Sequence, residues 1–302
     1  MSANRVVVAT GLDPSDSSLA VVRRPRRSRR KAVLLTGGLA YLVTFLIILP
    51  LLWVGLLSFQ SSNNILNSPL SLKSLSWHNY VNTFKNVPLA TMYKNTVILA
   101  SISVTIGTVI SFLSSFALTR LVFRHRRART AARLYLLGGL AIPVYILLFP
   151  VYRLDITLRI FGHYSALILP YVAVTIPFNT LILTGFLRDF PGDLEEAAII
   201  DGVSLSRLIW HVVLPLMKPV LATIVIFNLI YVFNEFPFIS ILGNSSGLTT
   251  VSLAVSQFQG AYSTDYGGMM AATTIILLPQ LAIYAIFQKQ VVAGITLGAV
   301  KG

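Results

Sequence analysis

The chain has 302 residues, of which 55% are apolar and only 11% are charged, whereas soluble domains carry about 25% charged residues. The composition therefore predicts an integral membrane protein. A net charge of +14 would otherwise suggest nucleic-acid binding, but the basic residues lie at the ends of apolar runs, as in a membrane topology signal. Since the chain has no cysteine, disulfides and thiolate chemistry are excluded.

Residues 1–32 are predicted to form a cytoplasmic basic tail. The tail begins with serine and aspartate and ends in a basic run that directly precedes the first apolar stretch. We expect this run to lie against anionic membrane lipid. A nucleic-acid-binding arm is the less favoured alternative, because the run adjoins a membrane span.

Six apolar stretches are long enough to cross a hydrocarbon core of about 30 Å, which takes roughly 20 residues. They are residues 33–58, 93–118, 134–153, 164–187, 219–242 and 267–288. The first is too long for the apolar core of a signal peptide, so it is interpreted as an uncleaved helix. With the external loop that follows, it forms a segment over 33–90. A membrane core over 91–290 and a C-terminal tail over 291–302 complete the predicted organisation.

The distribution of lysine and arginine predicts the orientation. With a cytoplasmic N-terminus, 19 of these residues fall in cytoplasmic segments and five in external ones. The positive-inside rule then places both termini in the cytoplasm. The segment 188–218 is cytoplasmic in this topology.

That cytoplasmic segment concentrates the acidic residues, because five of the ten in the chain lie between Asp189 and Asp201. We expect Asp193 to cap a short helix and to form a capping-box-like pair with Glu196. Asp201-Gly202 predicts the end of this helix, since glycine accepts the left-handed conformation. The alanines Ala197 and Ala198 would leave its surface open to close approach by another protein.

A second short helix is predicted after Ser204. Its apolar residues recur at the spacing of one buried helix face, and they are Leu205, Leu208, Ile209, Val212 and Val213. Pro215 would end this helix, and Pro219 would begin the fifth span. The segment is therefore predicted to be two short helices joined by a sharp turn at the inner membrane face. An ordinary amphipathic interfacial loop is the alternative.

The run Glu196-Ala197-Ala198, Asp201-Gly202, Ile209 and Leu214-Pro215 resembles the EAA motif of ABC-importer permeases. The resemblance implies a coupling helix that docks into a cleft of a cytoplasmic ATPase. The coupling residues that it implies are Glu195, Glu196, Ala197, Ala198, Asp201, Gly202, Leu214 and Pro215. Of these, Glu195 and Asp201 would add electrostatic contact with a basic ATPase cleft.

Two further stretches indicate which subfamily of these permeases the chain resembles. The whole resemblance covers about residues 90–302. Residues 233–237 are similar to the Trp-Asn-Glu/Asp-Phe run of carbohydrate-importer permeases, with Phe233 in place of the tryptophan. The ending, residues 294–302, resembles the tail of the maltose-type second permease. That likeness implies contact of Gly298, Lys301 and Gly302 with the ATPase dimer.

The implied fold is all-α, with six transmembrane helices in the type I ABC-importer permease fold. The implied function is that of a permease subunit in an ATP-driven bacterial carbohydrate importer of the inner membrane, forming half of the translocation pathway. Its partners would be a second homologous permease, an ATPase dimer and an extracytoplasmic solute-binding protein. The chain would bind no cofactor, since it has no P-loop and ATP and magnesium would lie on the ATPase.

Three polar residues of the fifth span are candidates for the translocation pathway or a subunit interface: Asn228, Asn234 and Glu235. Glu235 is the only carboxylate within a predicted span, which makes it a functional candidate. Packing or an inter-subunit hydrogen bond is as favoured for it as contact with sugar. The four histidines are scattered, and neither a metal site nor a catalytic constellation is predicted.

Three other functions are alternatives to this interpretation. An ABC permease for a non-sugar solute differs from the preferred interpretation only in cargo. A secondary transporter would carry inverted repeats and ionisable residues near the midplane, and the sequence has neither. No motif favours a non-transporting scaffold.

Overall fold

The computed structural model describes residues 26–71, 75–189, 192–243 and 247–299. The chain forms two compact units, Met1–Trp53 and Val54–Gly302. Helix α1 (Arg26–Leu57) supplies the described part of the first unit and runs into the second. The unit boundary thus falls inside the first apolar helix.

The second unit is helical. Its only β pairing among the described residues is an isolated bridge between Gln259 and Thr264. The elements after α1 are α2 (Ser62–Asn67), α3 (His78–Asn86), α4 (Leu89–Arg120), α5 (Arg126–Gly138), η1 (Gly139–Ala141), η2 (Val144–Leu147), α6 (Leu148–Thr157), α7 (Tyr164–Asp189), α8 (Asp193–Ile200), α9 (Leu205–Arg207), the π-helical turn η3 (Leu208–Val213), α10 (Leu214–Asn234), α11 (Pro237–Leu242), η5 (Val251–Leu253), η6 (Val255–Phe258) and α12 (Tyr266–Ala299).

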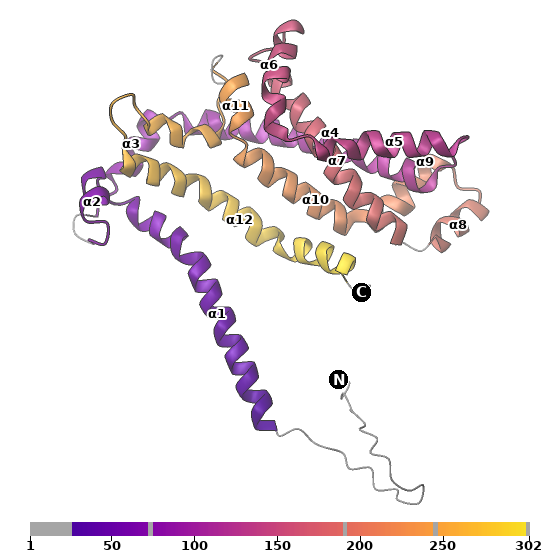
Figure 1. Ribbon diagram of the computed structural model, residues 1–302, viewed down its shortest axis with the longest axis horizontal. Helices are drawn as coiled ribbons and strands as arrows, with labels where there is room; N and C mark the ends of the chain where they lie inside the picture. Colours follow the sequence, from indigo (N-terminus) through magenta and orange to yellow (C-terminus); the bar gives the residue numbers. More distant parts are fainter. Residues whose placement is uncertain (1–25, 72–74, 190–191, 244–246, 300–302) are drawn as a thin grey trace, which may run out of the picture. The chain divides into compact units, whose positions relative to one another are not determined.

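Helix α4 packs along α7 and against α10, and α10 packs against α12, so these four helices form the body of the second unit (Figure 1). The close approach of α4 and α7 depends on small residues every four positions of α4, namely Ser103, Gly107, Ser111 and Ser115. A Cβ atom at Gly107 would lie 2.9 Å from the Thr175 hydroxyl, which shows how little room the interface leaves.

Five described helices are long and apolar enough to cross a membrane, and a sixth span is reached only if the bent pair α5 and α6 counts as one. The predicted span 134–153 therefore falls across the bend of this pair. The pair is bent by 95° around the segment that ends in Pro143. Proline disfavours the helical conformation of the residue before it, and Ile142 is indeed extended. Helix α6 accordingly projects away from the four-helix body (Figure 1).

The helix of the predicted fifth span differs from the range 219–242 at both ends. Its helix begins before Pro219, runs to Asn234, and is followed by the separate short helix α11. Glu235 takes an extended conformation there. Pro237 has no N–H to donate to the carbonyl of Phe233, and it is the first residue of the new helix α11.

Two clusters of buried apolar side chains hold the second unit together. The first joins α4, α7 and α11 through residues such as Leu99, Tyr171 and Phe238. The second joins α4, α7, α8 and α10 through residues such as Phe112, Leu183, Ala198 and Met217. The acidic helix α8 therefore packs against the core through Ala198.

Candidate functional site

Helix α8 begins one residue earlier than predicted. Gly192 is the N-cap, Asp193 is already helical, and no side chain caps the helix. The predicted capping box between Asp193 and Glu196 is therefore wrong, because the cap residue is a glycine. The backbone N–H of Glu196 instead donates to the carbonyl of Gly192 over 2.8 Å. The first turn still holds three carboxylates, which the helix dipole favours.

The end of α8 confirms the predicted turn. Gly202 has φ of +73°, in the left-handed region. Its N–H donates to the carbonyl of Ile199, and that of Val203 donates to the carbonyl of Ala198, both over 3.0 Å. These two bonds form a Schellman motif, which closes the helix and turns the chain sharply.

Gly202→Ala is expected to loosen this turn, since a left-handed alanine costs about 1–2 kcal/mol. Hydrogen exchange of the amides of α8 and Val203 in the assembled, detergent-purified protein measures the effect. Gly185→Ala is the control, because Gly185 lies in α7 with open space around its Cα. Equal exchange in the two variants would contradict a special role for Gly202.

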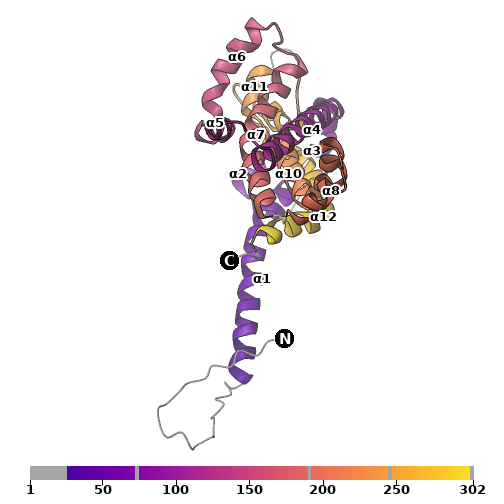
Figure 2. The same cartoon turned by 90° about the vertical axis from the view of Figure 1, so that its right-hand side faces the viewer.

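The two faces of α8 differ in character. Glu195 and Ala198 point into the protein and are buried, so Ala198 belongs to the core rather than to an open surface. The opposite face is exposed, with Ile200 85% accessible. Its members are Asp193, Glu196, Ala197 and Ile200. We call these four residues the outer face of α8. It carries two carboxylates and two apolar side chains. Figure 2 views the second unit from the end where α8 lies.

Glu195 does not face a partner as predicted. It is only 6% accessible and pairs with Arg120, the last residue of α4. The Arg120 Nε donates to Glu195 Oε1 over 2.9 Å and lies 2.8 Å from Oε2. The predicted direct contact of Glu195 with an ATPase cleft is therefore corrected, since its carboxylate is held inside this chain. The pair links α8 to the end of a long membrane helix.

Asp201 and Gly202 are exposed at the turn, and Ser204 follows as the N-cap of α9. The Ser204 hydroxyl makes no capping hydrogen bond, although the helix begins where predicted. The predicted apolar face is buried or half-buried except for Leu205, which is 51% exposed.

Pro215 does not end the second helix. The chain continues from α9 through η3 into α10. The segment from Leu205 to Asn234 is long and apolar enough to cross a membrane as one helix. Proline cannot donate the usual backbone hydrogen bond of a helix. The π-helical turn η3 directly before Pro215 lets the helix continue, because the Leu214 N–H donates to the carbonyl of Ile209, five residues earlier. Leu214 packs against the second core cluster, whereas Pro215 is exposed. One continuous helix therefore connects the turn at Gly202 with Asn234.

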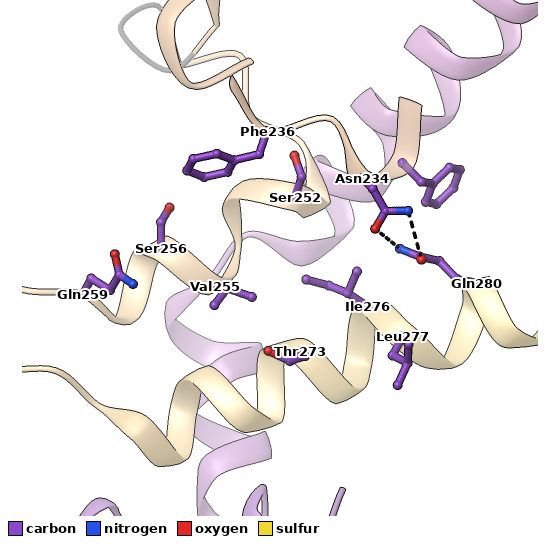
Figure 3. Close-up of a pocket in the computed structure, with 11 residues that line it drawn as sticks. Asn234, Phe236, Ser252, Val255, Ser256, Gln259, Thr273, Ile276, Leu277 and Gln280 are labelled. Atoms are coloured by element: carbon purple, nitrogen blue, oxygen red, sulfur yellow. Dashed lines mark hydrogen bonds between the residues drawn. The ribbon is translucent and has the colours of Figure 1, made fainter. Parts of the chain in front are cut away.

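The three polar residues of the fifth span lie in different surroundings. Asn228 is buried, and its side-chain N–H group has no hydrogen-bond partner among the described residues. Asn234 is exposed and pairs with Gln280 of α12 (Figure 3). The structure thus does not bring the three together into one site.

Glu235 is 4% accessible, and its carboxylate is occupied within the chain. It accepts hydrogen bonds from the Tyr171 hydroxyl over 2.7 Å and from the backbone N–H groups of Phe238 and Ile239 over 2.8 and 3.1 Å. Of the two predicted alternatives, this geometry favours packing. The Glu235 side chain ties α7 to the start of α11.

The predicted tail contacts are only partly within the described residues. Gly298 lies in the last turn of α12. Lys301 and Gly302 lie outside the described residues.

Sequence comparison finds a protein family that matches most of the chain. The family described as "Binding-protein-dependent transport system inner membrane component" matches residues 107–297. A putative ABC transporter permease protein of Caldicellulosiruptor sp. is 40% identical over 212 residues, covering 70% of this chain and 76% of that protein. The trehalose/maltose transport system permease protein MalG of Thermococcus litoralis is 33% identical over 276 residues, covering 90% and 98%.

Structural comparison agrees on the fold. A bacterial ABC transporter involved in the import of the acidic polysaccharide alginate contains a chain that superposes with a TM-score of 0.71. It covers 89% of this chain and 99% of the matched one at 17% identity. At this sequence identity the structural similarity supports the fold alone.

Proposed function

The chain belongs to the family of inner membrane components of binding-protein-dependent transport systems, and on this premise we propose that it is the permease subunit of an ATP-driven carbohydrate importer. It is a multi-pass inner membrane protein, and ATP hydrolysis belongs to a separate ATPase subunit. The observation that carries the carbohydrate assignment is the 33% identity to a trehalose/maltose permease over nearly its whole length. A secondary transporter without ATPase does not fit this family.

The outer face of α8 would be the surface that meets the ATPase. Glu196 and Ala197 of the EAA motif lie on it, next to Asp193 and Ile200. An ATPase moves a membrane domain only through contacts that differ between its open and closed states. The contact helix must therefore transmit force without bending. The Arg120–Glu195 pair, the Schellman turn and the continuous helix from Leu205 to Asn234 support this role.

The other partners follow from the same proposal. Two ATPase subunits would carry ATP and magnesium, and this chain would bind no cofactor. A second homologous permease would complete the translocation pathway, and an extracytoplasmic solute-binding protein would deliver the sugar. Both termini would be cytoplasmic, with the tail residues Gly298, Lys301 and Gly302 reaching the ATPase dimer and the basic N-terminal tail lying against lipid. A non-sugar solute is the remaining alternative for the cargo.

Glu196→Lys tests the coupling role, because it reverses one charge of the outer face without touching the core. We expect the variant, affinity-purified in mild detergent, to retain the second permease and to lose most of the ATPase that co-purifies with the wild type. Exposed ion pairs contribute only about 0–1 kcal/mol each, so reversal rather than neutralisation of the charge is needed.

Ala131→Lys is the control, since Ala131 is an exposed position of α5. It should retain both partners. If Glu196→Lys keeps the full amount of ATPase, α8 is not the coupling surface. If the folded wild type brings down no ATPase at all, the importer proposal itself fails.

A further inference from the structure

The second unit contains a cavity of about 390 Å³ at the end of α10. Its walls come from the last residues of α10, the segment η5–η6 and the middle of α12 (Figure 3). The volume falls within the range of about 300–1,000 Å³ that is typical of small-molecule sites. The position is notable because Asn234 and Gln280 belong to two segments that can cross the membrane.

The cavity wall combines amides, hydroxyls and an aromatic ring. The amides come from Asn234, Gln259 and Gln280, and the hydroxyls from Ser252, Ser256 and Thr273. The ring of Phe236 is 44% accessible. Amides offer both donors and acceptors, as sugar hydroxyls do, and an aromatic ring can cover the C–H face of a sugar.

The contact between two of these amides is weak. The Asn234 Nδ2 donates to Gln280 Oε1 over 3.3 Å, and the Gln280 Nε2 donates to Asn234 Oδ1 over 3.4 Å. Both distances lie beyond the usual 2.7–3.2 Å of N–H···O bonds. Asn234 is exposed and Gln280 is half-buried, and the Asn234 Nδ2 also donates to the carbonyl of Ile230 over 2.8 Å. The pair can therefore exchange its mutual bonds for bonds to a ligand at little cost.

The described lining holds no charged side chain. A carboxylated or sulfonated sugar would have to leave water without gaining an opposite charge, which is costly in a partly enclosed site. An uncharged sugar needs only the amides and hydroxyls that are present. The cavity therefore selects by charge as well as by hydrogen bonding.

We propose that this cavity is a binding site for an uncharged sugar unit, contacted by Asn234, Gln259, Gln280 and Phe236, so that this subunit itself handles the cargo. The inference rests on the proposed importer function. It adds that the transported carbohydrate is neutral and that α10 and α12 of this chain touch it during transport.

The test uses the complete importer, with its ATPase and solute-binding protein, in proteoliposomes. Radiolabelled trehalose, maltose and diacetylchitobiose serve as neutral sugars, and an alginate trisaccharide serves as an acidic one. The sugar that the wild type takes up best is then used for Gln280→Leu. The loss of one neutral hydrogen bond corresponds to a roughly threefold to tenfold reduction in uptake per ATP hydrolysed, and that is the expected result.

Two threonines provide a matched control. Thr273 lines the cavity, whereas its neighbour Thr274 does not, and each hydroxyl bonds the carbonyl four residues earlier in α12. Thr273→Val should therefore lower uptake per ATP, and Thr274→Val should not. Phe236→Ala should act like Gln280→Leu.

Each other result overturns the proposal. If Gln280→Leu and Thr273→Val take up sugar as the wild type does, the cavity is not used in transport. If these variants lose the second permease on purification, the cavity wall is a subunit interface. If only the acidic sugar is imported, the charge selectivity is wrong. If the wild type imports no sugar, the proposed function fails, and the sugar site fails with it.

Discussion

Replacing Arg120 with alanine is expected to release α8 from the membrane core and to uncouple transport from ATP hydrolysis. Glu195 would then remain buried without its partner. Breaking a buried ion pair from one side costs about 3–5 kcal/mol. Because the Arg120 side chain is 21% accessible, we expect a smaller value here, about 2–3 kcal/mol.

Hydrogen exchange of α8 in the assembled complex is the direct measurement. A local cost of this size corresponds to roughly 30- to 150-fold faster exchange of the α8 amides in Arg120→Ala. Sugar uptake per ATP hydrolysed should fall at least as clearly. Glu195→Ala should be milder, because an arginine left alone at this position can turn toward water.

The control for this prediction is Arg126→Ala, which removes an exposed arginine at the start of α5. It should change neither exchange nor uptake. The exchanged pair Arg120→Glu with Glu195→Arg should recover part of the protection. Unchanged exchange of α8 in Arg120→Ala would show that the ion pair does not anchor the helix.

Glu235→Ala is expected to destabilise the second unit more than any other single change considered. It removes the acceptor of three hydrogen bonds and leaves the Tyr171 hydroxyl and two backbone N–H groups buried without partners. At about 1–3 kcal/mol for each of the three unsatisfied groups, the sum reaches about 3–9 kcal/mol. The midpoint of thermal unfolding in detergent should fall accordingly, and less complex should assemble.

Two tyrosines separate this structural role from sugar contact. Tyr171→Phe removes one bond to Glu235 and should cost about 1–2 kcal/mol. Tyr231→Phe is its matched control, because the buried Tyr231 hydroxyl has no hydrogen-bond partner among the described residues and its loss should be neutral or stabilising. In all three variants the sugar concentration for half-maximal uptake should stay unchanged. A shift in that concentration for Glu235→Gln at normal stability would instead identify Glu235 as a sugar contact.

The sequence predicts those features correctly that depend on composition or on adjacent residues. The excess of apolar residues indicates a membrane protein, and the Asp201-Gly202 pair predicts a turn that the structure contains at Gly202. The acidic segment with its EAA motif points to a permease of an ABC importer, and the family match over residues 107–297 confirms that interpretation.

Predictions from single residues were wrong where a neighbouring turn could compensate. Pro215 was expected to end a helix, yet the π-helical turn before it lets the chain continue. Asp193 was expected to cap α8, but Gly192 already occupies that position. The predicted span 134–153 is not a single straight helix, because the chain bends by 95° between Ala141 and Val144. Helix boundaries depend on such small differences in backbone energy, which residue type alone does not resolve.

The sequence by itself therefore determined the class of protein, its apolar segments and the segment that carries the coupling motif. The tertiary structure alone decided which side chains of that segment face outward, and that Arg120 holds Glu195 from 75 residues away. It also decided that the Glu235 carboxylate accepts three hydrogen bonds. One comes from the hydroxyl of Tyr171, 64 residues away, and two come from backbone N–H groups. The physical reason is that burial and pairing of a charge depend on contacts between distant helices, whereas composition and turn preference are properties of adjacent residues.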